Sequence, residues 1–310
     1  MFAPPGRHLR GVERLPLVWL VPLLSGALAA CTGGSGQTDE SADKWPVTLA
    51  GSSTILPLAE RLAEHYHSVR PEAIIDVQGG GSSVGISSAL NGLADIGMVS
   101  RALEESELER LTPVVVALDG IAFIAHASNS VAGLSSEQVE QIYSGAITNW
   151  AAVGGHDAEI VVINKEEGRA TLHVVEEHFG LRGRFVKNAI VIGPNGQAIT
   201  TLAGNPDAIA YVSISAAEAA RHDGTPIRLL SLDEVIPTAE NVRGGEYTVK
   251  RPLLLVTGPT PSATARDFLS FILSPSGQQT VAELGFVPVS SDDDPNAAET
   301  ATHDQELAEP

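Results

Sequence analysis

Short apolar runs alternate with segments of helical periodicity along most of the chain. After Pro57, for example, Leu58, Leu62 and Tyr66 recur at four-residue spacing and predict a helix. Further helices are predicted at 86–90, 135–143, 171–179, 265–272 and 281–284, and strands at 47–50, 73–77, 96–98, 114–118, 121–125, 160–163, 189–192, 209–212 and 252–257. This regular alternation is typical of an α/β fold with mostly parallel sheets flanked by helices.

Three of the predicted strand-to-helix turns are unusually polar. The first is Gly-Ser-Ser-Thr at 51–54, and the second is Gly-Gly-Gly-Ser-Ser-Val-Gly at 79–85. Glycine lets the backbone approach a ligand closely, and the N–H groups at a helix start favour an anion. The third turn, at 164–171, adds Lys165 and Arg169, and a guanidinium can bind two oxygens of one oxyanion. Together the turns predict an anion-binding cradle.

The order of these and other short motifs resembles the phosphate-binding proteins of ABC importers, a branch of the type II periplasmic binding protein superfamily. The motifs that carry the resemblance, between about residues 47 and 289, are 50–54, 79–82, 94–97, Ser100-Arg101, 142–145 with 148–150, Asn195-Gly196-Gln197 and 274–278. The resemblance implies two α/β lobes with the ligand in the cleft between them. We expect the first lobe at 46–126 plus 245–290 and the inserted second lobe at 127–244.

The resemblance also implies the contacts from the first lobe. The donors of the first turn match Ser53 and Thr54, and the donor of the second turn matches Ser82. An aspartate of the family matches Asp95, and Arg101 lies at the other end of the same predicted strand. We expect Asp95 to accept the proton that phosphate keeps near neutral pH. Sulfate lacks this proton and would face the carboxylate as a second anion.

The third turn departs from the family pattern at three positions. Lys165 stands where the family usually has arginine, and Arg169 and Ala170 replace a serine and a glycine, while Thr171 keeps its hydroxyl. We expect these four residues to supply the contacts from the second lobe. Arg169 either supplies the two-pronged guanidinium donor that Lys165 cannot provide, or occupies the pocket in another way than the family's residues do. The ligand is therefore phosphate or a related tetrahedral oxyanion.

The N-terminal segment is typical of an export signal. Arg7, Arg10 and Arg14 precede an apolar run at 15–30 that is shorter than the roughly 20 residues of a bilayer span. Residues 28–31 resemble a bacterial lipoprotein box, which implies removal of residues 1–30, lipidation of Cys31 and a flexible tether at 31–45. We therefore expect an exported lipoprotein, periplasmic or on the cell surface, anchored to a bacterial membrane.

Composition narrows the classes of partner. The net charge of −19 makes nucleic acid an unsuitable partner, since phosphate backbones require a basic surface. Part of that charge lies at 291–310, a segment with seven acidic residues and no Lys or Arg, which predicts a disordered tail. Cys31 is the single cysteine of the chain, and no H-E-x-x-H motif occurs, so neither a metal nor another cofactor is expected.

The preferred hypothesis is a monomeric, lipid-anchored solute-binding protein that captures phosphate or a related oxyanion for an ABC permease and has no enzyme activity. A serine hydrolase is one alternative, because 81–85 fits the nucleophile-elbow pattern G-x-S-x-G, with Ser82 as the suggested nucleophile. A surface module that senses an anion without transporting it is another. The sequence does not separate this module from a transport component.

Overall fold

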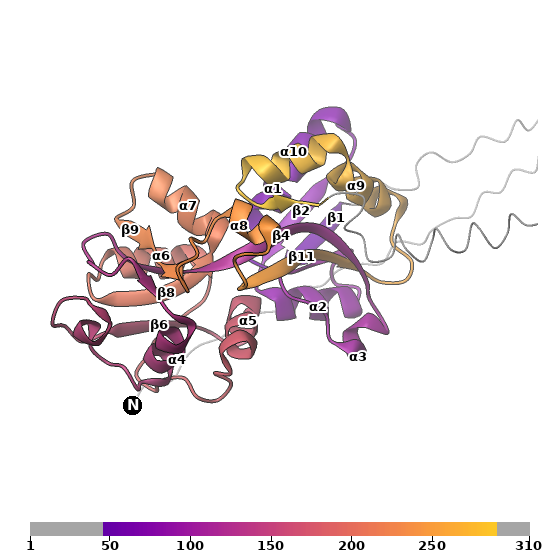
Figure 1. The fold of residues 1–310 in the computed structure, drawn as a ribbon. Helices are drawn as coiled ribbons and strands as arrows, with labels where there is room; N and C mark the ends of the chain where they lie inside the picture. Colours follow the sequence, from indigo (N-terminus) through magenta and orange to yellow (C-terminus); the bar gives the residue numbers. More distant parts are fainter. Residues whose placement is uncertain (1–45, 290–310) are drawn as a thin grey trace, which may run out of the picture. The chain divides into compact units, whose positions relative to one another are not determined.

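The computed structural model describes residues 46–289 (Figure 1). The predicted export signal, the lipidated Cys31, the tether and the acidic tail all lie outside these residues. Between residues 46 and 289, no helix combines the length and the apolar character needed to cross a membrane.

The main sheet is mixed. Over residues 46–289 its strands follow the order β2-β1-β3-β11-β4-β8-β6-β7, and β9 and β12 also pair with β4. The strands are β1 (Val47–Gly51), β2 (Ile75–Gly79), β3 (Ile96–Val99), β4 (Thr112–His126), β6 (Val161–Lys165), β7 (Ile190–Ile192), β8 (Ala208–Ser213), β9 (Ile227–Leu229), β11 (Lys250–Thr257) and β12 (Val287–Pro288), with β5 (Gly133–Leu134) and β10 (Ser231–Leu232) forming a separate pair. The parallel pairing that the alternation predicts occurs within β2-β1-β3 and within β8-β6-β7, whereas β4 and β11 join these groups by antiparallel pairing.

The helices follow the predicted order, with additions. They are α1 (Leu56–Val69), α2 (Ser82–Leu90), α3 (Glu105–Leu108), α4 (Ser136–Ser144), α5 (Ala170–Phe179), α6 (Asn195–Ala203), α7 (Ile214–His222), α8 (Ala239–Gly244), α9 (Ala263–Leu273) and α10 (Pro275–Glu283). Several starts have local causes: Ser135 caps α4 by accepting the N–H of Gln138, and Ser274 caps α10 by accepting the N–H of Gly277. The helices α3, α6, α7 and α8 were not predicted from periodicity, because their apolar stripes are short.

Helices cover both faces of the sheet around β11 (Figure 1). Leu253 and Leu255 pack in a core cluster with residues of α1 and α9, while Leu254 and Val256 pack in another cluster with residues of α2. Successive side chains of a strand point to opposite faces, so this run is apolar throughout without alternating polar positions. Burial on both faces explains the strongly apolar character of 252–257.

The strand β4 is longer than predicted. The expected strands at 114–118 and 121–125 form one strand, because Asp119 and Gly120 stay extended and pair with Arg251 and Lys250 of β11. Gly120 is required by packing: a Cβ there would lie 2.3 Å from the Ile214 side chain and 2.8 Å from that of Val242. The helices α7 and α8 therefore approach β4 closely at this point.

The strands β4 and β11 contribute residues to two large hydrophobic cores. Residues 121–125 of β4 belong to a cluster with Trp150 and Tyr211, although the sequence placed them in the first lobe. Ala117 of β4 and Leu253 of β11 belong to a different cluster, with Leu49 and Phe268. Asp119 and Arg251 thus lie between two apolar cores. Beside them, Pro252 lacks an N–H for the ladder, and the β4–β11 register shifts between Leu253 and Leu254.

We predict that Phe268→Ala lowers the free energy of unfolding by about 3–5 kcal/mol, because Phe268 is fully buried and its removal leaves a cavity in the second of these cores. Chemical denaturation measures this change. The matched control is Leu273→Ala in the same helix, where the side chain is 44% exposed and the expected change is within about 0.5 kcal/mol. Equal losses in both variants would contradict the assigned core.

Candidate anion-binding site

The first two polar turns meet at the end of β3. The strands β1, β2 and β3 are parallel, so the segments that follow them lie at one edge of the sheet. Ser52 donates to the hydroxyl of Ser100 at 2.9 Å, and Ser82 Oγ accepts the Ser100 N–H at 3.0 Å. All three serines are almost completely buried. The predicted convergence of the two serine-rich turns is therefore present in the structure.

Gly81 makes the approach of the third turn possible. Its φ of +103° lies in a region that side-chain-bearing residues rarely adopt, and a Cβ at this position would lie 3.1 Å from the Gly168 carbonyl oxygen. Next to it, the Ser83 N–H donates to that same carbonyl at 3.3 Å. The glycine that the sequence marked for close approach thus contacts protein backbone of the third turn.

Two helices that pack in the core with Trp150 and Tyr211 contribute donors from their starts. Thr171 lies in the first turn of α5 and Asn195 at the start of α6, and both are buried. The Asn195 Nδ2 donates to Thr54 Oγ1 at 3.3 Å, and Arg169 Nη1 donates to Ser53 Oγ at 3.3 Å. Side chains of both cores therefore meet at the first turn.

Arg251 joins these groups. Its Nη1 donates to Thr171 Oγ1 at 2.9 Å and lies 3.4 Å from Ser100 Oγ, and its Nη2 donates to Thr54 Oγ1 at 3.1 Å. The guanidinium also pairs with Asp119, with Nη2 and Nε at 2.9 and 3.2 Å from Oδ2. Both side chains are about 1% exposed. We call Ser52, Thr54, Ser82, Ser100, Thr171, Asn195 and Arg251 the hydroxyl cluster.

Asp119 is the buried counter-ion of the hydroxyl cluster. Burial raises the pKa of its carboxyl, and the charge and hydrogen bonds of Arg251 act in the opposite direction. Its second oxygen, Oδ1, accepts from Ser213 at 3.0 Å. Removing one partner of such a pair leaves an uncompensated charge, so each residue is needed to keep the other buried.

Lys165 lies beside the hydroxyl cluster and is only 3% exposed. Its Nζ donates to the Gly193 carbonyl oxygen at 3.3 Å. Burial, together with the charges of Arg251 and Arg169, lowers the pKa of Lys165 to about 7. A bound anion would act in the opposite direction, because it would stabilise the ammonium form. The predicted cation of the third turn is thus buried and close to neutralisation.

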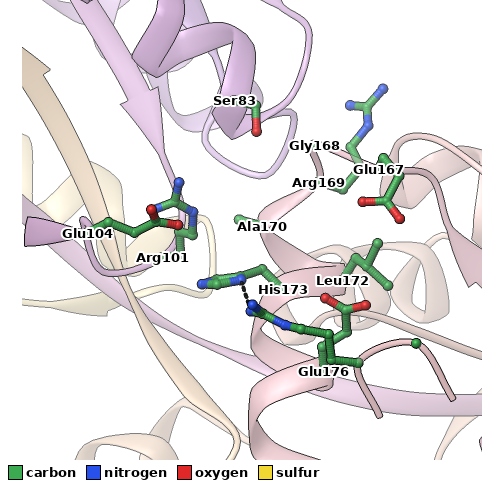
Figure 2. A pocket seen from close by; sticks show the side chains of 12 residues that line it. Ser83, Arg101, Glu104, Glu167, Gly168, Arg169, Ala170, Leu172, His173 and Glu176 are labelled. Atoms are coloured by element: carbon green, nitrogen blue, oxygen red, sulfur yellow. Dashed lines mark hydrogen bonds between the residues drawn. The ribbon is translucent and has the colours of Figure 1, made fainter. Parts of the chain in front are cut away.

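Arg169 and Ala170 border a cavity of about 420 Å³ at the outer side of the third turn. Figure 2 shows Ser83, Arg101 and Glu104 on one wall and the residues from Glu167 to Glu176 on the other. The guanidinium of Arg169 pairs with Glu166, with Nε 2.8 Å from Oε1, so part of its charge is already compensated. Ala170, the first residue of α5, is buried.

The structure does not bring Asp95 to the hydroxyl cluster. Its carboxylate is exposed and accepts the Thr48 N–H at 2.9 Å, at the amino end of β3, whereas Ser100 follows the carboxyl end of that strand. The prediction that Asp95 faces the ligand is therefore wrong in position. Arg101 lies at the correct end, but both of its terminal nitrogens pair with Glu107 at 2.8 Å.

Sequence reasoning missed Ser52, Ser100, Asn195, Arg251 and Asp119. Asn195 and Ser100 stand within quoted motifs without an assigned role. A signal for the ion pair was available, because Arg251 and Asp119 are charged residues next to strongly apolar runs and are direct partners in the β4–β11 register. A charge within a buried strand requires a partner, and the other strand supplies it.

The nucleophile-elbow alternative finds no support in this geometry. In strict register the serine of the G-x-S-x-G pattern is the exposed Ser83, and the Ser82 hydroxyl pairs with Ser100 instead of a histidine. Within residues 46–289, no three His, Cys, Asp or Glu side chains are grouped so that they could hold a metal ion.

Comparison with known proteins places the chain in a family. The model of the PBP superfamily domain matches residues 30–276. The chain belongs to this superfamily. Among its relatives, the phosphate-binding protein PstS of Bacillus subtilis is 28% identical to this chain over 300 residues, which cover 90% of this chain and 95% of the relative. PstS of Borreliella burgdorferi is also 28% identical, over 254 residues, 79% of this chain and 90% of the relative.

Solved structures agree with this assignment. The phosphate ABC transporter substrate-binding protein of Clostridium perfringens, with bound phosphate, is 34% identical to this superfamily member, with a TM-score of 0.74 over 79% of this chain and all of that one. An ABC-type phosphate transport receptor from Vibrio cholerae is 31% identical, with a TM-score of 0.66 over 78% of this chain. These matches confirm the predicted family and the two-lobe α/β fold class.

The lowered pKa of Lys165 predicts a pH-dependent stability. Between about pH 7 and the ordinary lysine pKa of 10.5, the folded state binds fewer protons than the unfolded state, so unfolding becomes harder as the pH rises through this window. In the absence of anions, the free energy of unfolding of the wild type should rise by about 1.4 kcal/mol per pH unit in this window, a few kcal/mol in total. The variant Lys165→Met should lack this rise. Chemical denaturation at pH 7 and pH 10 measures the change in the free energy of unfolding. The exposed Lys187→Met is the control and should keep the wild-type slope.

Proposed function

We propose that this chain binds inorganic phosphate at the hydroxyl cluster and Lys165, and delivers it to an ABC permease. One observation carries the proposal: buried hydroxyl, amide and cationic donors from both cores converge beside the starts of α1, α2, α5 and α6. The names of the relatives, and the phosphate in the Clostridium perfringens structure, support the same ligand.

The donors suit a tetrahedral oxyanion. Thr54, Ser82 and Thr171 supply hydroxyls, Lys165 supplies an ammonium, and the first N–H groups of α5 have no partner within the helix. Such donors act without large net charge, so an acidic protein can hold an anion in a buried site. Of the predicted contacts, we retain Ser53, Thr54, Ser82, Lys165, Arg169, Ala170 and Thr171, and we add Ser100, Asn195 and Arg251.

Binding and closure are coupled in this proposal. Thr54 and Ser82 belong to the side of the cleft formed by β1, β2 and β3, whereas Lys165 and Thr171 belong to the opposite side. An anion held by both sets stabilises the closed arrangement of two lobes, which we place near 46–126 plus 245–290 and 127–244. The closed form is then the one that the permease distinguishes.

The hydrogen bonds of the serine hydroxyls favour a ligand-binding site over a catalytic site. A hydrolytic site requires a nucleophile next to a general base, whereas Ser82 and Ser52 hydrogen-bond to another serine. We therefore propose that the chain is not an enzyme.

We further propose that Cys31 carries the lipid anchor of a monomeric, exported protein, periplasmic or on the cell surface, with residues 31–45 as the tether. Co-purification with an ABC permease would separate a transport role from an anion sensor without a permease.

Calorimetric titration of the full chain with phosphate tests the proposed ligand. We expect saturable binding and a raised thermal midpoint. Thr171→Val should weaken binding roughly 10- to 100-fold, since a hydrogen bond to a charged group contributes about 1.5–3 kcal/mol. The control is Thr200→Val, which removes an exposed threonine of α6 and should leave affinity unchanged. Wild-type protein that shows neither heat nor stabilisation with phosphate would refute the assignment.

A further inference from the structure

We propose that the side-chain oxygen of Asn195 accepts the hydrogen that phosphate carries, and that this residue distinguishes phosphate from sulfate. The inference rests on the proposed function and assigns a selecting residue within the same site. It follows from the hydrogen bonds of the hydroxyl cluster, which leave this oxygen as an acceptor among groups that donate.

The start of α6 holds the Asn195 amide in place. Asn195 is the first residue of the helix and is 6% exposed, and it follows Pro194, whose ring fixes the backbone φ. The N–H of the preceding Gly193 donates to Gln197 Oε1 at 3.0 Å, which ties this turn to the helix. The side chain of Asn195 therefore extends from a well-defined backbone.

The first polar turn orients the amide. Its Nδ2 donates to Thr54 Oγ1 at 3.3 Å, whereas Oδ1 receives no hydrogen bond from residues 46–289. Oδ1 is not enclosed either, since the enclosed side-chain atoms without a partner in this range are Asn129 Nδ2 and Tyr143 OH. An amide oxygen has two lone pairs and no hydrogen. Oδ1 is thus an accessible group that can only accept.

The hydroxyl of Thr54, next to the amide, can only donate to a ligand. Its Oγ1 accepts from Arg251 Nη2 at 3.1 Å as well as from Asn195 Nδ2, and these two bonds use both lone pairs. Its hydrogen remains for an anion. The amide therefore has two effects on the site: its nitrogen makes Thr54 a donor, and its oxygen is an acceptor.

Other hydroxyls of the cluster adapt to the ligand. Thr171 Oγ1 accepts from Arg251 Nη1 at 2.9 Å and keeps one lone pair and one hydrogen, so it can accept or donate. An anion of either kind can be accommodated by rotation of such a hydroxyl. The oxygen of Asn195 cannot change its role in this way, so it fixes the preference of the site.

The carboxylate of the cluster is already engaged. Asp119 accepts from Ser213 on Oδ1 and from Arg251 on Oδ2. Asp95, the acceptor expected from the sequence, lies at the far end of β3. The neutral amide of Asn195 therefore takes the role that the sequence assigned to a carboxylate.

Phosphate and sulfate differ at this oxygen by one hydrogen. At pH 8 phosphate is mostly the dianion with one proton and sulfate is a dianion without one, so the two match in charge and in tetrahedral shape. Phosphate donates its hydrogen to Asn195 Oδ1, whereas sulfate would place an oxygen against it, two acceptors with no hydrogen between them. A neutral acceptor also avoids the repulsion that a carboxylate would exert on the phosphate dianion.

Calorimetric titration of the full chain at pH 8, with phosphate and with sulfate, tests the inference. We expect the Kd of the wild type for phosphate to be at least roughly tenfold lower than its Kd for sulfate. Equal Kd values for the two anions would overturn the inference and leave the proposed function standing. If phosphate gives neither heat nor thermal stabilisation, the proposed function fails and the inference fails with it.

Two variants separate the oxygen of the amide from its nitrogen. Asn195→Asp keeps an acceptor but loses the donor to Thr54, whereas Asn195→Leu, of similar size, loses both. We expect the Leu variant to lower the ratio of the sulfate Kd to the phosphate Kd at least roughly tenfold, and the Asp variant to keep or raise this ratio.

A Leu variant that keeps the wild-type ratio, or equal losses of the ratio in the Leu and Asp variants, would contradict the acceptor role of Asn195. Thermal unfolding without anions verifies that each variant folds. If the Leu variant does not fold, Asn195→Ala removes the same oxygen with a smaller side chain, and the same drop in the ratio is expected.

Discussion

The pairing of Arg251 with Asp119 is the interaction on which the rest of the site depends. Both charges lie between two apolar cores, where neither would be stable alone. Because Asp119 fixes two guanidinium nitrogens, the remaining hydrogens reach the hydroxyls of Thr54 in the first turn, of Ser100 after β3 and of Thr171 in α5. A salt bridge of this kind contributes little net stability by itself, but it determines where the polar groups of both cores meet.

Comparison with the family adds the context that one chain cannot supply. The match over residues 30–276 fixes the fold class, and relatives at about 30% identity name a common ligand. In this chain the third turn holds a lysine with a pKa of about 7 in a buried position. Charge in this site is therefore adjustable by pH to a degree that an arginine would not allow.

Much of the fold could be predicted from the sequence, because burial on both faces makes most positions of β8 and the run 252–256 of β11 apolar and because Pro57 and Ser135 mark helix starts. The site could be predicted only in part. Turns that follow parallel strands converge by topology, which explains why the predicted residues Thr54, Ser82, Lys165 and Thr171 lie near one another. Arg251 and Asp119 lie 132 positions apart and meet only through antiparallel strand pairing. Asp95, by contrast, directly precedes the predicted strand at 96–98, so its place at the amino end of β3 could have been recognised from the sequence.

The irregular ladder beside Arg251 has a mechanical consequence. A proline is rare in a central strand, and here Pro252 and the register shift after Leu253 weaken the β4–β11 ribbon where it passes from one core to the other. Twisting of this ribbon would concentrate at that point, one residue from the guanidinium. The irregular part of the ladder and the central cation are thus adjacent, so that a change in the twist of the ribbon at this point would displace Arg251 directly.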